Sequence, residues 1–305
     1  MTDIVTGASG YLGRRLTHRF DEMDRDYVGL SSRDADLTFQ ESLLPYNTVK
    51  YDRIFHLASW TQAGDFCLYH RGEQWLINQQ INTTVLSWWQ KHQPQAKLVS
   101  IGTSCSYPVG SDHREELYLD GTPIEDLFTY AMTKRMLLIG QQSLNKQFGL
   151  RYLTVVPSTL YGPGYEQTNK QAHFIFDLIR KILRHKHFGE DVILWGDGSQ
   201  RREVVFIDDF VGTMLELDAK VENEVVNIGA GEDHSIREFA ELICDIAGVN
   251  ESDIQYDPAQ YVGAKVKSLN NAKLDMLLPE RPTIALREGL SRTITWMEER
   301  IRNQA

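Results

Sequence analysis

Residues 3–13 read DIVTGASGYLG, a short apolar strand followed by a glycine-bearing turn and the start of a helix. Gly7, Gly10 and Gly13 would let the backbone turn tightly and approach an anion at the helix N-terminus, where free N–H groups and the helix dipole favour negative charge. An ordinary strand-to-helix turn commonly uses one glycine rather than three at this spacing. We therefore favour a dinucleotide-binding turn over a purely structural one.

Strand and helix patterns alternate after this turn. Apolar strands are predicted at residues 27–30, 53–58, 96–101 and 150–156, with helical segments between them. This alternation predicts an α/β fold built on a Rossmann-type doubly wound parallel sheet. In the helical region that ends near residue 93, we expect the apolar residues Trp75, Leu76, Trp88 and Trp89 to face the core.

The pattern changes after residue 157. Helices are expected near residues 171–187, 235–247 and 283–302, and short strands near 204–207, 225–228 and 254–256. Asp208 and Asp209 are expected to cap the helix that follows the first of these strands. We predict two interleaved domains: an NADP-binding Rossmann domain of residues 1–157 and 204–230, and a smaller α/β substrate-binding domain of residues 158–203 and 231–305.

Bulk properties exclude several classes of protein. The formal net charge of −10 over 305 residues argues against a nucleic-acid partner, which needs a basic face. No apolar run approaches the roughly twenty residues of a membrane span, and the N-terminus shows no signal-peptide pattern. Three scattered cysteines indicate neither a disulfide framework nor a metal site. A cytoplasmic protein without a metal or membrane partner is the expectation.

The end of the second strand addresses the choice of dinucleotide. In this fold that point meets the adenosine ribose, where an acidic residue suits NAD and a basic one suits NADP. The chain reads Ser31-Ser32-Arg33-Asp34 there, so that Arg33 could pair with a 2′-phosphate. NADP(H) is favoured, while the acidic residues Asp34 and Asp36 nearby keep NAD(H) possible, and Arg33 could also be a solvated loop residue.

Two further stretches carry catalytic side chains. Residues 102–108, GTSCSYP, form a hydroxyl-rich turn after an apolar strand, at the strand end where open parallel sheets bind ligands. Tyr130 and Lys134 stand four apart, which places them on one helix face. There the ammonium could lower the pKa of the phenol and make it an acid or base near neutrality. Alone, the pair is more often an exposed lysine beside a half-buried tyrosine, and the surrounding motifs favour catalysis.

Taken together, these motifs resemble the extended short-chain dehydrogenase/reductases, the nucleotide-sugar epimerase/dehydratase family. The matching pieces are TGASGYLG at 6–13, HLA at 56–58, Asn78, the hydroxyl turn, the Tyr130/Lys134 pair, LYGP at 160–163 and REVVFIDD at 202–209. They run in family order over nearly the whole chain. Within the family, the likeness is greatest to the GDP-L-fucose synthases, whose turn reads GSSCIYP.

The resemblance implies the site residues. Catalytic roles fall on Thr103, Cys105, Tyr130, Lys134 and His173, which follows the LYGP element by ten residues. Cofactor-binding roles fall on Gly7, Ser9, Gly10, Tyr11, Leu12, Gly13, Arg33, Asp36, Leu37, Leu57, Ala58, Asn78, Tyr130, Lys134, Pro157, Leu160 and His173. Substrate-binding roles fall on Ser104, Thr159, Lys181, Trp195, Arg202 and Lys267, with Lys181 the weaker candidate.

The implied activity is an NADPH-dependent epimerase and reductase acting on a GDP-4-keto-6-deoxy sugar, a hexose or a heptose. Cys105 and His173 would exchange protons at C3 and C5, and Tyr130 would donate a proton to the oxygen at C4. The alternatives are a 4-epimerase, or a 4-reductase or dehydrogenase, without inversion at C3 or C5, and a catalytically silent cofactor-binding protein. A homodimer is expected through the helices spanning about 66–91 and 128–147, which relatives use for pairing.

Overall fold

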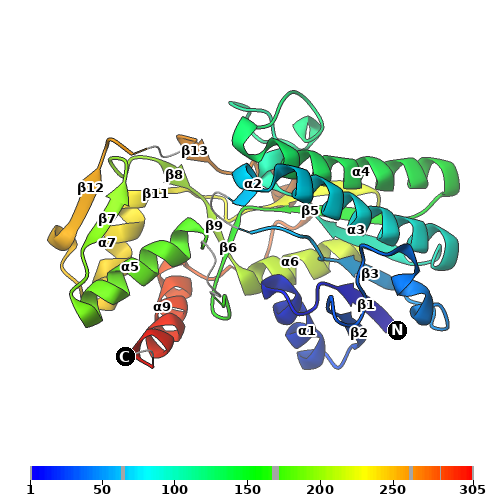
Figure 1. Cartoon of the computed structure of the whole chain (residues 1–305), viewed down its shortest axis with the longest axis horizontal. Helices are drawn as coiled ribbons and strands as arrows, with labels where there is room; N and C mark the ends of the chain where they lie inside the picture. The colour runs from blue at the N-terminus through cyan, green and yellow to red at the C-terminus, as the bar shows by residue number, and fades with distance from the viewer. Residues whose placement is uncertain (1, 63–65, 167–171, 261–263, 282, 304–305) are drawn as a thin grey trace.

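A six-stranded parallel sheet forms the centre of the protein (Figure 1). The computed structural model describes residues 2–62, 66–166, 172–260, 264–281 and 283–303. The strand order is β2-β1-β3-β4-β5-β10. The strands are β1 (Thr2–Thr6), β2 (Asp26–Leu30), β3 (Arg53–His56), β4 (Lys97–Ile101), β5 (Tyr152–Pro157) and β10 (Glu224–Ile228). The predicted Rossmann-type parallel sheet is confirmed.

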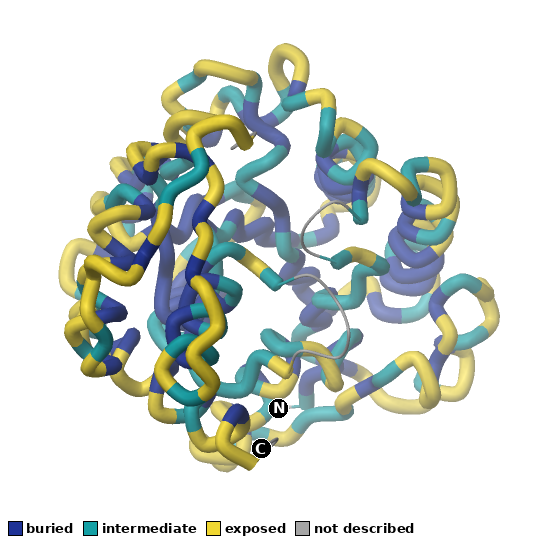
Figure 2. Tube along the Cα trace, turned by 60° about the vertical axis from the view of Figure 1, so that its left-hand side comes forward, coloured by how far each residue is buried: buried dark blue, intermediate teal, exposed yellow. Residues whose placement is uncertain are grey.

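Helices cover both faces of this sheet. On one face, α1 (Tyr11–Glu22) and α6 (Ile207–Lys220) pack with Val5 and Phe55 of the strands. On the other face, α3 (Arg71–His92) and α4 (Phe128–Phe148) pack with Ile4 and Ile54. Adjacent strand residues thus point into opposite cores, which explains why the strands read as continuous apolar runs. Figure 2 shows the buried residues gathered inside and the exposed residues on the outer helix faces and loops.

The apolar residues of α3 divide between core and surface. Trp88 and Trp89 are buried, as predicted. Trp75 and Leu76 are 39% and 63% exposed, so the prediction that they face the core is wrong. Both stand in the first turns of the helix, where its outer face has no covering element among the described residues.

A smaller unit stands beside the sheet, with its own core. Phe176 of α5 (Phe174–Phe188), Phe239 and Ile243 of α7 (Ile236–Ala247) and Leu290 of α9 (Leu286–Arg302) lie together in it. Its strands are β7 (Val192–Trp195) with β12 (Ile254–Asp257), β8 (Arg201–Arg202) between β11 (His234–Ser235) and β13 (Val266–Lys267), and β6 (Thr159–Tyr161) with β9 (Val204–Phe206). The domain boundaries stay a prediction. In α8 (Ala272–Leu277), Leu274 packs into the core shared by α1 and α6.

Short helical turns complete the chain between these elements. They are α2 (Phe66–Tyr69) and the 3₁₀ segments η1 (Gln40–Tyr46), η2 (Ser104–Ser106), η3 (Glu115–Leu117), η4 (Glu125–Leu127) and η5 (Glu251–Asp253). The expected helix near 171–187 begins at Phe174, and residue 171 lies outside the described residues. Among the described residues, no helix has the length and apolar character that crossing a membrane requires.

Asp208 and Asp209 do not cap α6, which corrects the expectation. The helix begins at Ile207, and Phe206 is its N-cap without a side-chain hydrogen bond. Asp208 instead accepts hydrogen bonds from Arg15 of α1, including one of 2.7 Å from Nη2. Asp209 accepts one of 2.8 Å from the backbone N–H of Ile284. The two carboxylates therefore tie α6 to the glycine-turn helix and to the segment before α9.

The glycine turn packs against the loop after β3. Gly7 has φ of +73°, and a Cβ there would lie 2.7 Å from the backbone nitrogen of Ala58. A Cβ on Gly13 would lie 2.2 Å from the carbonyl oxygen of Gly7. Both glycines are required by close backbone approach, in the way a phosphate-binding turn requires.

We expect Gly13→Ala to lower the free energy of unfolding by about 1–3 kcal/mol, because its Cβ meets backbone atoms that cannot move aside. It should also weaken NADPH binding, since the turn must open to admit the methyl group. The matched control is Gly212→Ala in α6, where a Cβ meets nothing within 4 Å. That change should raise stability by about 0.5–1 kcal/mol. Urea unfolding and NADPH fluorescence titration measure both effects. Equal stability of the two variants would contradict the packing argument.

Candidate active site

Thr103 and Tyr130 meet at the carboxyl end of the sheet. Thr103 lies two residues beyond the end of β4 and is the N-cap of η2, where its hydroxyl accepts a 3.2 Å hydrogen bond from the N–H of Cys105. Tyr130 stands in the first turn of α4. The Thr103 side chain is a hydrogen-bond partner of the phenol. The sequence-predicted pair of hydroxyls is therefore assembled by a strand end and a helix start.

Burial dominates the electrostatics of Tyr130 and Lys134. Desolvation raises the pKa of Tyr130, the charge of Cys105 raises it further, and the hydrogen bond with Thr103 opposes both. Desolvation lowers the pKa of Lys134 to about 8. The expectation that Lys134 lowers the pKa of the phenol is therefore wrong for this structure. Near neutral pH the phenol carries its proton and the lysine is charged, which makes Tyr130 an acid.

The charge of Lys134 acts on a buried histidine. His56 has its pKa lowered to about 4 by desolvation and then by the charge of Lys134. Its Nδ1 stands 2.8 Å from the hydroxyl of Thr6, and its Nε2 stands 3.3 Å from Oδ1 of Asn82. The Asn82 side chain in turn donates to the carbonyl of Thr133. A neutral imidazole thus connects the end of β1 with the helix that carries the lysine.

Cys105 contacts Lys267, although 162 positions separate the two in the sequence. The ammonium of Lys267 donates to the sulfur at a distance of 3.2 Å. Cys105 is partly exposed, whereas Cys67 and Cys244 are buried. The sequence analysis assigns Lys267 to substrate binding and Cys105 to catalysis. In the structure the two side chains are in contact.

His173 joins this group from the smaller unit. It is the N-cap of α5 and an exposed residue. The protein packed around it nevertheless lowers its pKa to about 4 by desolvation, and the charge of Lys267 lowers it further. A neutral imidazole at pH 7 can accept a proton. Lys267 therefore acts electrostatically on His173 while it contacts the thiol of Cys105.

Sequence reasoning missed Tyr118 and Arg135, which hold the hydroxyl turn in place. The oxygen of Tyr118 accepts a 3.2 Å hydrogen bond from the N–H of Thr103. Arg135 is 4% exposed, and its guanidinium donates to the carbonyls of Ser106 (2.9 Å from Nε) and Gly121 (2.8 Å). Spacing could have revealed Arg135, because it lies on the helix face of the buried Ala131 and Leu138. Tyr118 leaves no such signal.

The expected cofactor residues cluster around the glycine turn. Gly7, Ser9, Gly10, Tyr11, Leu12 and Gly13 span the turn and the start of α1, Leu57 and Ala58 follow β3, and Pro157 and Leu160 stand in β5 and β6. Asn78 is buried, and its amide is fully engaged with its own surroundings: it accepts from Ser59 and from the N–H of Trp60, and donates to the carbonyls of Trp60 and Gln74. These hydrogen bonds hold the loop after β3, and a cofactor contact of Asn78 stays a prediction.

The end of β2 presents a cation. Arg33 is exposed in the turn after the strand, while Leu37 is buried behind it. The carboxylate of Asp34 accepts from the N–H and hydroxyl of Ser31 at 2.8 and 2.6 Å. The carboxylate of Asp36 accepts from the N–H and hydroxyl of Thr38 at 3.0 and 2.7 Å. Both carboxylates are occupied within their own turns, which leaves Arg33 as the side chain suited to a phosphate.

The expected substrate residues separate into two groups. Arg202 and Lys267 are register partners in β8 and β13, and Ser104 and Thr159 lie in η2 and β6. Trp195 ends β7 and is 60% exposed. The ammonium of Lys181, in contrast, pairs with Asp177 at 3.2 Å and donates to the carbonyl of Ile193. Among the described residues, no group of three or more metal-ligating side chains is found.

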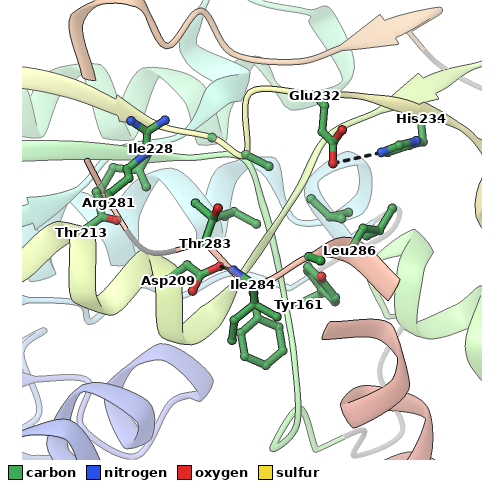
Figure 3. A pocket seen from close by; sticks show the side chains of 16 residues that line it. Tyr161, Asp209, Thr213, Ile228, Glu232, His234, Arg281, Thr283, Ile284 and Leu286 are labelled. Carbon is green, nitrogen blue, oxygen red and sulfur yellow. Dashed lines mark hydrogen bonds and ion pairs between the residues drawn. The ribbon is translucent and has the colours of Figure 1, made fainter. Parts of the chain in front are cut away.

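A separate pocket lies where α6, β10 and the segment before α9 meet (Figure 3). Asp209, Thr213, Arg281 and Thr283 line it, with Glu232 and His234 on the other side. None of the residues predicted from the sequence to act on cofactor or substrate lines this pocket. We therefore assign it no part in the chemistry.

Comparisons of the sequence and of the structure with known proteins point to the same family. Residues 4–229 match the model of the NAD dependent epimerase/dehydratase family. The chain is 31% identical to GDP-L-fucose synthase 1 of Arabidopsis thaliana, over 98% of this chain and 94% of that protein. The crystal structure of a GDP-L-fucose synthetase from Naegleria fowleri, also solved bound to NADP, superposes with a TM-score of 0.87 at 22% identity, over 99% of this chain and 94% of that one. A GDP-6-OMe-4-keto-L-xylo-heptose reductase from C. jejuni superposes with a TM-score of 0.87 at 18% identity, over 98% of each chain.

We expect Lys134→Met to be more stable than the wild type at pH 7, by about 1–3 kcal/mol, because it removes a desolvated charge. The pKa of Lys134 is about 8 in the folded protein, whereas in the unfolded chain it has its ordinary value of 10.5. Wild-type stability therefore rises with pH across that window, and the advantage of the variant shrinks. Urea unfolding at pH 7 and pH 10 measures it. Lys146→Met, an exposed lysine of the same helix, is the control. An unchanged difference between the two pH values would contradict the assignment.

Proposed function

We propose, because this chain belongs to the NAD dependent epimerase/dehydratase family, that it is an NADPH-dependent epimerase and reductase of a GDP-linked 4-keto-6-deoxy sugar, either a hexose or a heptose. The observation that carries this proposal is the meeting of two sets of side chains. Thr103, Tyr130 and Lys134 form the reduction set, and Cys105 adjoins Tyr130 while it contacts Lys267. A phenol, a thiol and an ammonium thus lie in one place.

The residues around the glycine turn fit NADP. The turn brings backbone so close that a Cβ at Gly7 or Gly13 would collide, which leaves room for a pyrophosphate only if both stay glycine. Arg33 would bind the 2′-phosphate, because the neighbouring carboxylates are engaged in their own turns. When bound, NADPH supplies the hydride that reduces C4.

On the reduction side, Tyr130 donates a proton to the oxygen at C4. Its raised pKa means that it carries this proton at neutral pH. Thr103 hydrogen-bonds the same oxygen and orients the phenol, and Lys134 holds the nicotinamide ribose. These roles follow the family resemblance, and the contact of Thr103 with Tyr130 supports them.

On the epimerisation side, His173 and Cys105 exchange protons at C3 and C5. The ketone at C4 acidifies both positions, because an enolate can form. Since desolvation and the charge of Lys267 lower the pKa of His173 to about 4, its neutral imidazole is ready to accept a proton. Cys105 then returns a proton to the opposite face of the carbon. Inversion needs two such groups, and the chain supplies two.

The diphosphate and base would lie along the smaller unit. Arg202 and Lys267 are register partners in adjacent strands, so their cations lie on one side of that sheet. Trp195 offers an exposed aromatic face to the base. Lys181 would have to leave Asp177 to reach a phosphate. Ser104 and Thr159 remain proposed sugar contacts.

A reductase that inverts no carbon is the second candidate, because the C. jejuni heptose reductase shares the fold. Incubation with GDP-4-keto-6-deoxymannose and NADPH in deuterated water separates the two candidates. We expect deuterium at C3 and C5 of the product, read by NMR. Cys105→Ser and His173→Gln should each lower this incorporation by roughly 100-fold or more. Tyr130→Phe should lose reduction while it still binds NADPH, and Tyr27→Phe, at a half-buried tyrosine whose hydroxyl donates to Asp21, should behave as wild type. Reduced product without deuterium would contradict epimerisation and support the reductase that inverts no carbon.

We also propose a homodimer formed through α3 and α4. The outer faces of α2, α3 and α4 expose Leu68, Tyr69, Trp75, Leu76, Phe128, Met136 and Ile139. An ion pair joins Arg71, at the start of α3, to Glu125 of η4, the segment directly before α4, so these side chains lie on neighbouring elements. Trp75 and Leu76 would be covered by the partner, which explains their exposure here. The cytoplasmic location expected from the sequence stays a prediction.

We expect Leu76→Glu to yield a monomer in size-exclusion chromatography with light scattering, where the wild type is a dimer. A carboxylate buried in an apolar interface would lack a partner. Met276→Glu is the control, because that methionine is exposed on α8, away from this surface. A monomeric wild type, or a dimeric Leu76→Glu variant, would contradict the proposal.

A further inference from the structure

The ammonium of Lys267 contacts the sulfur of Cys105, which a role in binding phosphate alone does not explain. Its register partner Arg202 lies beside it, yet its ammonium donates to the sulfur of Cys105 at 3.2 Å. A thiol is a weak acceptor, and an ammonium directed at sulfur is matched best by a thiolate. The contact therefore concerns the chemistry of the sulfur.

The backbone of Lys267 is held firmly. Its carbonyl accepts a 3.2 Å hydrogen bond from the N–H of Glu203. The buried carboxylate of Glu203 accepts 2.9 Å hydrogen bonds from the N–H groups of Leu269 and Gly231. The imidazole of His113 meets the carbonyl of Ser268 at 2.7 Å. The ammonium is therefore placed by a fixed segment.

The phenols, the imidazoles and the thiol of Cys67 around this contact are neutral near pH 7. Desolvation raises the pKa of Tyr118, Tyr130 and Cys67, each of which feels the charge of Cys105. Desolvation lowers the pKa of His113 and His173, which both feel the charge of Lys267. Arg135 also brings a positive charge to this turn, but its guanidinium donates to backbone carbonyls, including that of Ser106, whereas the ammonium of Lys267 contacts the sulfur itself.

We propose that Lys267 is a positioning residue for epimerisation, whose ammonium holds the sulfur of Cys105 in place and stabilises its thiolate form. The proposal rests on the proposed function. When Cys105 gives its proton to carbon, the S–H bond breaks, the new C–H bond forms, and the electron pair stays on sulfur beside the ammonium. In the reverse direction the thiolate takes the proton and the electron pair of the C–H bond passes to the enolate. Lys267 lowers the energy of the charged state in both directions.

Alkylation of Cys105 by iodoacetamide tests this without substrate, because only the thiolate reacts. Peptide mass spectrometry follows the rate from pH 6 to pH 10 in wild type, Lys267→Met and Lys267→Arg. The buried Cys67 and Cys244 are internal controls for loss of fold. We expect Lys267→Met to slow the reaction of Cys105 at pH 7 by roughly tenfold or more, and Lys267→Arg to restore most of the rate. Identical pH profiles for wild type and Lys267→Met would overturn the proposal.

Kinetics separate this role from phosphate binding. We expect Lys267→Met to lower kcat for deuterium incorporation at saturating substrate. A residue that only held the diphosphate would raise KM and leave that kcat unchanged, which would also overturn the proposal. If alkylation depends on Lys267 but the wild type incorporates no deuterium, the proposed epimerisation fails and the thiolate pairing stands. The two failures are thus distinguishable.

Discussion

The site depends on the buried guanidinium of Arg135. Thr103 and Cys105 project from a turn that has little regular structure of its own, only one 3₁₀ segment. Arg135 fixes that turn by donating to the carbonyl of Ser106, and it holds the following loop through the carbonyls of Asp120 and Gly121. Buried carbonyls without donors would be costly, so this single side chain makes the turn both stable and unique. Because Arg135 follows Lys134 in α4, the helix that carries the reducing pair also fixes the turn.

A second buried group transmits this order to the smaller unit. The amide of Asn227, at the end of β10, accepts a 2.6 Å hydrogen bond from Tyr107 and donates to the carbonyls of His113 and Asn270. Tyr107 ends the active-site turn, and Asn270 lies just beyond the segment of Lys267. The distance between Cys105 and Lys267 is therefore set by these polar contacts together with the pairing of the two-residue strand that carries the lysine. This explains how a short strand can place an ammonium accurately.

Much of the fold and part of the candidate site could be predicted from the sequence. The features that could not be predicted share a physical cause. The parallel sheet, the glycine turn and the helix of Tyr130 and Lys134 follow from local periodicity, which a sequence displays directly. The contact of Lys267 with Cys105 joins residues 162 positions apart through a chain of buried polar groups, and no local pattern encodes it. The prediction of a lowered pKa for Tyr130 was wrong for a related reason. The spacing of the two residues gives the distance between Tyr130 and Lys134 but not how deeply the phenol is buried. Trp75 and Leu76 show the same limit, because periodicity identifies an apolar face without its partner.

Two lysines bring positive charge to different sides of the site. Lys134 stands on the side of the phenol, and Lys267 stands at the thiol. The two sides communicate, because charge on Cys105 raises the pKa of Tyr130. In the proposed function Cys105 gives its proton to carbon; the sulfur would then be negative and the phenol would hold its own proton more tightly. Tyr130 is then still protonated when the oxygen at C4 comes to need a proton during reduction. Loss of the phenol proton before that point would leave two anions side by side in a desolvated site, which Coulomb repulsion disfavours. In the proposed function epimerisation precedes reduction, because reduction removes the ketone that acidifies C3 and C5.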